Sequence, residues 1–139
     1  MPPGGPRRLK EMQHERHYSL DEANAALPAV AQLLERLRSA RQRLSDSQAR
    51  DALSEAGPTN GGGEPGRTVS EAFLALRDGL VELRDREVVL RDLERGLVDF
   101  PAIREGREIY LCWEEGEEEI AFWHEPDTGF AGRKPLADD

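Results

Sequence analysis

The chain has 139 residues, of which 34% are charged and 37% hydrophobic, and its formal net charge is −9. This length fits one domain, and the acidic balance argues against nucleic-acid binding, which depends on cations that displace counterions from phosphate. No apolar run reaches the length of a membrane span and the N-terminus lacks the apolar region of a signal peptide, so we expect a cytoplasmic protein with no nucleic-acid or membrane partner. The single cysteine, Cys112, excludes an intrachain disulfide and fits a reducing compartment.

The beginning of the chain, MPPGGPRRLKEMQHERH, is rich in proline, glycine and charge and has little apolar surface to bury. We therefore predict a mobile N-terminal extension over residues 1–17, ahead of a single domain over 18–139.

A first long helix is predicted over 19–53. Ser19 and Glu22 have the spacing of a capping box, in which a hydroxyl and a carboxylate satisfy two backbone N–H groups at a helix start. Apolar residues then recur at steps of three and four, as they do on one face of a helix: Leu20, Ala23, Leu27, Val30, Leu34, Leu37 and Leu44. Pro28 cannot donate a helical hydrogen bond, so we predict a kink or a short break there.

A flexible linker is predicted over 57–66, because GPTNGGGEPG has five glycines and two prolines in ten residues. A second capping-box spacing, Thr68 and Glu71, opens a second helix over 69–95. Its apolar seam runs through Val69, Phe73, Leu76, Leu80, Leu83, Leu90 and Leu97. Gly96 supplies a residue that can adopt a positive φ, as a helix stop requires.

Two long helices joined by a short linker are expected to pack antiparallel. Centring the connection at 61–62 predicts four facing pairs of opposite charge: Arg36 with Glu87, Arg38 with Asp85, Arg41 with Glu82, and Asp46 with Arg77. Exposed pairs of this kind contribute about 0–1 kcal/mol each, so they select the register more than they stabilise it. A second apolar stripe on helix two, Leu74, Val81 and Val88, offers a surface for the C-terminal third to dock on.

The segment 107–124 alternates apolar and polar residues around EEGEE, which predicts a β-hairpin with a turn at Glu115 and Gly116. This register places three pairs opposite each other: Ile109 and Phe122, Leu111 and Ile120, Trp113 and Glu118. It also points Cys112 and His124 to opposite faces, which argues against a metal site built from both.

A turn-rich segment over 125–139 follows the hairpin. The candidate ligand-binding residues lie at the end of the hairpin and in this segment: Trp123, His124, Glu125, Asp127, Phe130 and Arg133. His124 and Asp127 are the candidate metal ligands, although no cofactor is indicated and a histidine at a strand end more often makes a structural hydrogen bond. The turns and Arg133 could also hold a carboxylate or phosphate, whereas most of the aromatic residues fit a core.

Three stretches, YSLDEANAALP, GLVDFPAIREGREIYLCWEEGEEEIAFWHE and GFAGRKPL, resemble an uncharacterised bacterial family known as domain of unknown function 2203. The resemblance covers about residues 18–136. It implies a compact bacterial protein and brings no activity, cofactor or catalytic residue, but it adds weight to Trp123, His124, Glu125, Phe130 and Arg133 as a shared surface feature.

The predicted fold is α+β and mainly helical, a long antiparallel helical hairpin capped by a C-terminal β-hairpin. Because helix two has more apolar surface than one partner helix covers, we expect two hairpins to form a four-helix bundle in a homodimer. The leading hypothesis is a non-catalytic, self-associating module that acts through protein contacts. The alternative is a small-molecule- or metal-dependent enzyme or binding protein with a site around Trp123–Arg133.

Overall fold

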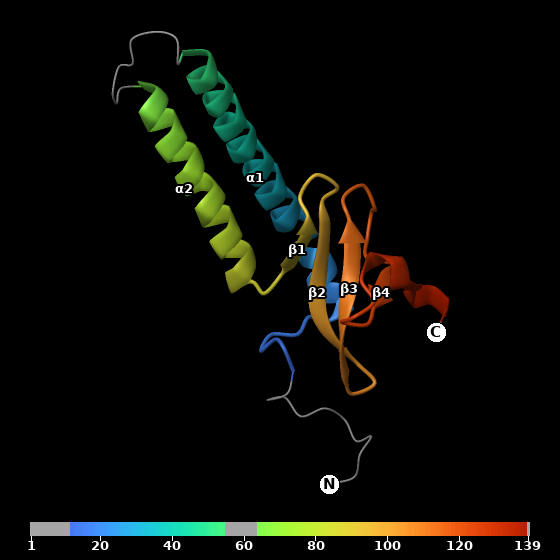
Figure 1. Ribbon diagram of the computed structural model, residues 1–139. Helices are drawn as coiled ribbons and strands as arrows, with labels where there is room; N and C mark the ends of the chain where they lie inside the picture. The colour runs from blue at the N-terminus through green and yellow to red at the C-terminus, as the bar shows by residue number, and fades with distance from the viewer. Residues whose placement is uncertain (1–11, 55–63, 139) are drawn as a thin grey trace.

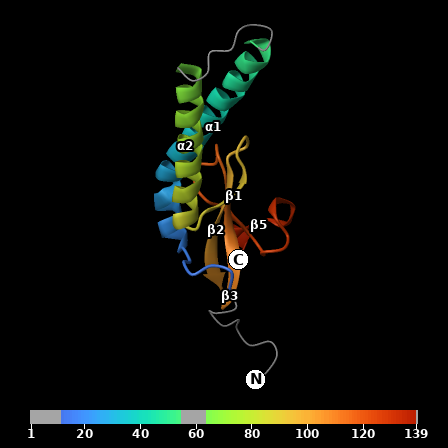
Figure 2. The ribbon, with the colours of Figure 1, turned by 60° about the vertical axis from the view of Figure 1, so that its left-hand side comes forward.

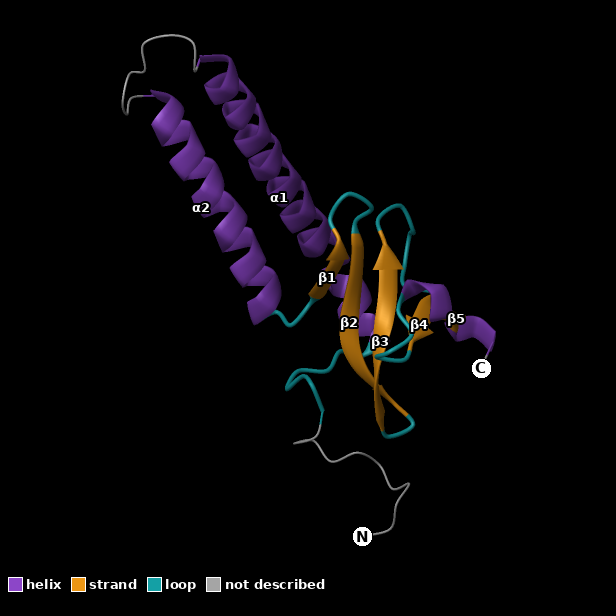
Figure 3. Cartoon of the chain, in the orientation of Figure 1, coloured by secondary structure: helices purple, strands orange, loops and turns teal. Residues whose placement is uncertain are grey.

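The computed structural model describes residues 12–54 and 64–138, which form two helices followed by an antiparallel sheet (Figures 1 and 3). The helices are α1 (Leu20–Ser54) and α2 (Glu64–Asp85). The strands are β1 (Val89–Asp92), β2 (Leu97–Arg104), β3 (Arg107–Glu114), β4 (Phe122–His124) and β5 (Lys134–Pro135), with short 3-10 helices η2 (Phe130–Gly132) and η3 (Leu136–Asp138) around β5. The predicted α+β class is confirmed.

Helix α1 begins at the predicted capping box. The Ser19 N–H donates to Glu22 Oε1 at 2.8 Å, and the Glu22 N–H donates to Ser19 Oγ at 3.0 Å. The helix continues through Pro28, so the predicted alternative of a break is wrong, while the kink stays a prediction. No helix in the described part of the chain is long and apolar enough to cross a membrane.

Helix α2 lies earlier in the chain than the predicted 69–95. It already includes residues 64–66 of the predicted linker, of which 57–63 lie outside the described residues, and Thr68 is inside the helix rather than at its cap. It ends at Asp85 because Glu87 adopts a φ of 55°, which no continuing helix allows.

The antiparallel helices meet in another register than predicted. A Cβ on Gly79 would lie 2.7 Å from Leu37 Cδ2, so these two residues face each other. Arg38 instead pairs with Glu35 and Glu115, and Arg41 with Glu94. Three other residues of the predicted pairs also have different partners: Glu82 pairs with Arg86, Arg77 with Asp78, and Glu87 with His14. The four predicted charge pairs are therefore wrong, because the second helix starts earlier and ends before Glu87.

The sheet is a five-stranded meander in the order β1-β2-β3-β4-β5. Strand β1 occupies the stretch predicted as the end of helix two, and Gly96, with a φ of 67°, lies in the turn between β1 and β2 and does not end a helix. Val98 pairs with Trp113, and Phe100 with Leu111, across the long β2–β3 ladder. The predicted hairpin is thus part of a larger sheet.

The helices and the sheet form two layers (Figure 2). Alternate residues of β2 and β3 face α1 and make one core with it: Ala23, Leu27, Val30, Leu33, Leu34, Leu37, Val98, Phe100, Ala102, Ile109, Leu111 and Trp113. Helix α1, whose N-terminal half lies behind β2 and β3 in Figure 1, therefore carries the sheet. The predicted docking stripe on helix two is wrong in part, since Leu74 is 44% exposed.

Strand β4 pairs with β3 in a different register than predicted. The turn at Glu115 and Gly116 forms, with Gly116 at a φ of 109°, but the chain then leaves the sheet and returns at Phe122. Cys112 lies opposite Phe122, and Tyr110 lies opposite His124. This odd shift exchanges the faces of β4, so Cys112 and His124 lie on the same face and not on opposite ones.

The described part of the predicted mobile extension is packed against the sheet. The Tyr18 N–H donates to the carbonyl of Pro101 at 2.7 Å, and the backbone of Gln13 and His14 donates to Glu108. We call residues 12–18 the N-terminal strap. Residues 12–17 thus have defined polar partners, Glu108 on β3 and Glu87 ahead of β1, while their mobility stays a prediction.

Candidate functional site

Three neighbouring strands bring Asp99, Cys112 and His124 together on the sheet face that points away from the helices. Asp99 of β2 pairs directly with Cys112 of β3, and His124 of β4 lies two residues beyond Phe122, the β4 partner of Cys112. The potential ligand atoms of these three side chains all lie within 4.8 Å of one another, and all three residues are buried. We call this group the Asp99 cluster.

His124 is held at both ring nitrogens. Its Nδ1 lies 2.7 Å from the carbonyl oxygen of Glu125, and its Nε2 lies 2.8 Å from Asp99 Oδ2. Because both partners are acceptors, this geometry favours the imidazolium form, in which both nitrogens donate. Burial alone would lower the pKa of His124, but the hydrogen bonds to Asp99 and Glu125 outweigh it and raise the pKa above its ordinary value.

Asp99 is the charged centre of the cluster and is 1% exposed. Its Oδ2 accepts from His124 and also from Arg91 Nε, at 2.8 Å each. Its other oxygen, Oδ1, is buried and has no hydrogen-bond partner among the described residues. The neighbouring Cys112 thiol, whose hydrogen bond to Asp99 contributes to its raised pKa, is only a weak donor to this carboxylate, and a buried carboxylate oxygen without a strong donor is costly.

Cys112 is a buried thiol. Burial, and secondly the negative charge of Asp99, raises the pKa of the Cys112 thiol to about 12. The thiol is therefore protonated at neutral pH, and His124 has both nitrogens engaged elsewhere. The arrangement lacks the thiolate–imidazolium pair of a cysteine nucleophile.

Arg133 closes the cluster from the C-terminal segment. Its guanidinium lies 3.7 Å from the centroid of the Phe122 ring and 4.6 Å from that of Phe130. Nη1 is 3.9 Å from Cys112 Sγ, and Nη2 donates to Glu117. Arg133 thus pairs with a carboxylate of the chain itself, and its role in binding an external anion stays a prediction.

The other predicted site residues lie around the cluster and not in it. Trp123 packs against the core, and the cations of Arg104 and Lys134 lie 4.7 and 5.0 Å from its ring centroid. Phe130 is 37% exposed, with the Arg95 guanidinium over its ring. Glu125 contributes its backbone carbonyl to His124 while its carboxylate pairs with Lys134. Asp127, the predicted metal partner of His124, is exposed and is not one of the three clustered ligands.

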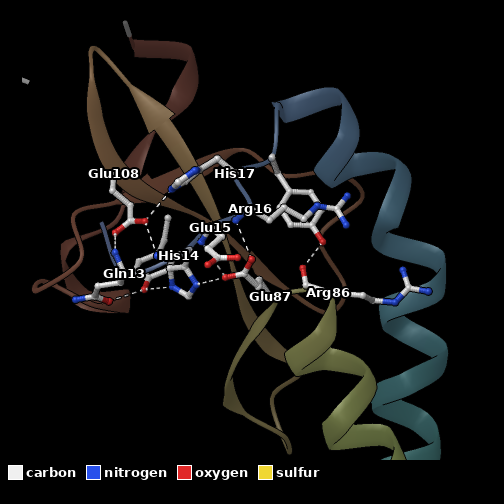
Figure 4. A network of polar contacts seen from close by, with 10 residues as sticks. Gln13, His14, Glu15, Arg16, His17, Arg86, Glu87 and Glu108 are labelled. Carbon is white, nitrogen blue, oxygen red and sulfur yellow. Dashed lines mark hydrogen bonds and ion pairs between the residues drawn. The ribbon is translucent and has the colours of Figure 1, made fainter. Parts of the chain in front are cut away.

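The N-terminal strap adds a second polar network beside the cluster (Figure 4). The Glu108 carboxylate accepts from the N–H groups of Gln13 and His14 and from His17 Nε2, at 2.8 to 3.1 Å. The Glu87 carboxylate accepts from the N–H groups of Glu15 and Arg16, at 3.2 and 2.8 Å. Each carboxylate thus binds two consecutive backbone N–H groups, which is how proteins cradle anions.

Tyr110 connects the strap to the cluster. Its hydroxyl lies 2.8 Å from His14 Nε2, and its ring centroid is 5.4 Å from that of His124. The Arg91 guanidinium lies 5.0 Å from the centre of the same ring. Through Glu108 and Tyr110, all three histidines of the chain therefore belong to one connected set of polar and ring contacts.

Sequence reasoning missed Asp99, Arg91 and Glu108. Asp99 interrupts an apolar strand, Leu97–Val98–Asp99–Phe100, and an acidic residue in such a run is the signal that could have identified it. Arg91 and Glu108 carry no comparable signal, because charged residues at such positions usually face solvent.

Three comparisons with known proteins bear on this geometry. A family model described as an uncharacterized conserved protein (DUF2203) matches residues 16–136, which include the strap from Arg16 on, both helices and the cluster. No curated protein matches the chain. No solved structure matches it either.

Proposed function

The chain belongs to the DUF2203 family of uncharacterised conserved proteins, and we propose that it acts as a non-catalytic interaction module that binds a second copy of itself through α2. The absence of a cysteine–histidine nucleophile pair from the described cluster supports a non-catalytic role. The free, buried Cys112 is compatible with a reducing compartment and supports a cytoplasmic location.

The observation that carries the proposal is the apolar surface that α2 leaves exposed. Phe73 is 59% exposed and Leu80 is 45% exposed. They are seven residues apart, which is about two helical turns, so they lie on one face. A buried-type aromatic residue left this exposed next to a second apolar residue marks an association surface.

A groove continues this face toward the sheet. It has a volume of about 310 Å³ and runs between the end of α2 and β1, where apolar residues make up most of its lining: Leu80, Leu83, Val88, Val89 and Leu90. Such a concave apolar surface accepts a projecting side chain, and Phe73 of another copy has the right character.

A second copy is the occupant that this surface fits best. Phe73 projects and Leu80 lines the groove, and the two lie about 10 Å apart along α2. A two-fold axis between them brings Phe73 of each copy to the groove of the other, which makes the surface self-complementary. The Arg77–Asp78, Arg84–Asp85 and Arg86–Glu82 pairs make the stretch 73–86 neutral, whereas the whole chain carries −9.

The shape of the molecule supports the same arrangement. The ends of both helices nearest the 55–63 connection extend beyond the sheet (Figures 1 and 2). There each helix has one neighbouring helix and no sheet, and a second hairpin would complete a four-helix bundle.

The test is the mass of the full chain in solution. Sedimentation equilibrium at micromolar concentration is expected to give twice the 15.6 kDa of the chain. Phe73→Glu and Leu80→Glu are each expected to give the monomer with an unchanged circular dichroism spectrum, because both side chains are exposed in one copy. A charge buried at the proposed interface opposes association.

Ile103→Glu is the matched control. Ile103 is 43% exposed but lies at the far end of β2, so this variant is expected to remain a dimer. A wild-type protein that sediments only as a 15.6 kDa species would refute the proposal. So would a dimer that Phe73→Glu and Leu80→Glu leave intact.

A further inference from the structure

We propose that Asp99, Cys112 and His124 form a binding site for one divalent transition-metal ion, with Zn²⁺ as the preferred ion. The proposal goes beyond self-association and does not depend on it. It rests on the ligand types, their placement on three strands and the buried oxygen of Asp99 that has no donor.

The three side chains supply a carboxylate oxygen, a sulfur and an imidazole nitrogen, each of which is a common zinc ligand. Their ligand atoms lie within 4.8 Å of one another, so small side-chain movements place all three around one ion. Three protein ligands leave a fourth tetrahedral position for water, as in open zinc sites.

The surroundings hold the ligands as metal sites usually do. His124 Nδ1 donates to the carbonyl of Glu125 at 2.7 Å, which turns Nε2 toward Asp99 and Cys112. Arg91 donates to Asp99 Oδ2 at 2.8 Å, and Oδ1 is the oxygen that lacks a partner. Coordination through Oδ1 would satisfy this atom while Arg91 keeps its hydrogen bond.

The net charge of the cluster also permits a divalent ion to replace two protons. Without metal, His124 carries a proton on Nε2 and Cys112 carries one on sulfur. When Zn²⁺ binds, the N–H and S–H bonds break, metal–nitrogen and metal–sulfur bonds form, and two protons leave to solvent. The ion brings two positive charges and two leave, so the net charge of the buried cluster does not change.

The neighbouring arginines determine which ion fits. Arg91 pairs with Asp99, and Arg133 pairs with Glu117. The positive charges of these two arginines still repel a cation, so they disfavour an ion that is held by electrostatic attraction alone. Mg²⁺ and Ca²⁺ depend on several oxygen ligands and would bind poorly. Zn²⁺ and Co²⁺ bind thiolate and imidazole strongly enough to displace the protons.

The experiment is a Co²⁺ titration of the full chain after removal of metal by a chelator. One equivalent is expected to saturate the protein and to produce a cobalt–thiolate charge-transfer band in the near ultraviolet. Zn²⁺ is expected to abolish the band by displacement, whereas Mg²⁺ and Ca²⁺ leave it. A pH indicator in weak buffer is expected to report proton release when Zn²⁺ binds, since the Cys112 thiol loses its proton.

Two variants assign the ligands. Cys112→Ser is expected to remove the charge-transfer band, and His124→Gln to weaken metal binding by about 10- to 100-fold or more. His17→Gln is the matched control, because His17 binds Glu108 outside the cluster, and it is expected to bind Co²⁺ like the wild type.

The wild-type titration decides the proposal even if a variant fails to fold. Folded wild-type protein that binds no stoichiometric Co²⁺ or Zn²⁺ at micromolar concentration would overturn it. A cobalt band that persists unchanged in folded His124→Gln would overturn the assignment of the ligands.

Discussion

The carboxylate of Glu108 ties the N-terminal strap to the sheet. Glu108 is 4% exposed, and its two oxygens accept from two backbone N–H groups and one imidazole. Burial by itself raises the pKa of this carboxyl, but the donors of Gln13, His17 and His14 outweigh burial and lower the pKa from its ordinary value of 4.5. The folded protein therefore favours the ionised form.

This shift makes the contribution of Glu108 to stability depend on pH. A carboxyl whose pKa is lower in the folded state stabilises the fold fully above the unfolded pKa and loses that effect as pH falls through the folded pKa. Glu108→Gln is expected to lower the free energy of unfolding by about 1.5–3 kcal/mol at pH 7, since it removes hydrogen bonds to a charged group. The difference from wild type is expected to shrink at pH 3.

Urea unfolding of both proteins at the two pH values measures this difference. The pH dependence that the other acidic groups cause cancels in it, because both proteins contain those groups. Glu118→Gln is the control, since Glu118 is exposed and its replacement is expected to change stability by under about 0.5 kcal/mol. A deficit for Glu108→Gln that is equal at pH 7 and pH 3 would contradict the assignment.

Asp99 shows the other way in which a buried carboxylate is accommodated. Glu108 has donors for both oxygens, whereas Asp99 has two donors on Oδ2 and none on Oδ1 among the described residues. Complete removal of Asp99 would leave the imidazolium of His124 buried without its counter-charge, which is among the more costly changes in a protein interior.

At the scale of elements, the end of α2 marks where sequence periodicity ceases to be informative. Leu83, Leu90 and Leu97 are seven residues apart and fit a helical seam, yet Leu90 and Leu97 belong to strands. The helix stops through the positive φ of Glu87, a conformation that glutamate seldom adopts and that its sequence context does not signal.

The start of α1 and the positive φ of two glycines, in contrast, were predictable because their causes are local, although Gly96 was predicted to end a helix and instead lies between β1 and β2. The Ser19–Glu22 capping box forms, and Gly96 and Gly116 adopt positive φ values of 67° and 109°. The β3–β4 register was not predictable, since it depends on residues 118–121 leaving the sheet, where the Ile120 N–H donates to the side chain of Asn24 96 positions away. That long-range contact decided which face His124 occupies, and so hid the Asp99 cluster from the sequence.

The helix register can be tested at Gly79. Alanine favours a helix over glycine by about 1 kcal/mol, but its Cβ would lie 2.7 Å from Leu37 Cδ2 in a packed interface, and overpacking costs about 1–3 kcal/mol. We expect Gly79→Ala to destabilise the wild type. In a Leu37→Val background, where that methyl group is absent, the same substitution is expected to be neutral or stabilising.

Urea unfolding of the four proteins in this double-mutant cycle, at one protein concentration, measures the coupling between the two residues. Additive effects would mean that Gly79 and Leu37 do not meet, and would favour a different register of the two helices.

At the scale of the whole molecule, Arg133 of the C-terminal segment lies against Cys112 on the helix-distal face, so a reagent reaches this thiol only when the segment or the sheet opens. Cys112 is 1% exposed in that face, and the thiolate is the reactive form. With a pKa of about 12, roughly one thiol in ten thousand is ionised at pH 8. We expect alkylation of Cys112 in the presence of a chelator to be at least about a thousand-fold slower than in the urea-unfolded chain.

The rate of mass increase with iodoacetamide gives this comparison directly. Ser45→Cys in a Cys112→Ser background is the control, because Ser45 is exposed on α1 and its thiol is expected to react almost as fast as in the unfolded chain. Alkylation of folded wild type within tenfold of the unfolded rate would show that this face opens on its own.

The N-terminal strap affects the order in which the parts of the chain fold. Gln13 leaves the ribosome early, but its partner Glu108 lies 95 residues later in the chain. During translation the strap therefore has no native partners until β2 and β3 have been synthesised, and the same holds for the sheet-facing side of α1. Closure of so long a loop is entropically slow relative to the pairing of neighbouring strands. The segment that is synthesised first is thus expected to reach its native position among the last.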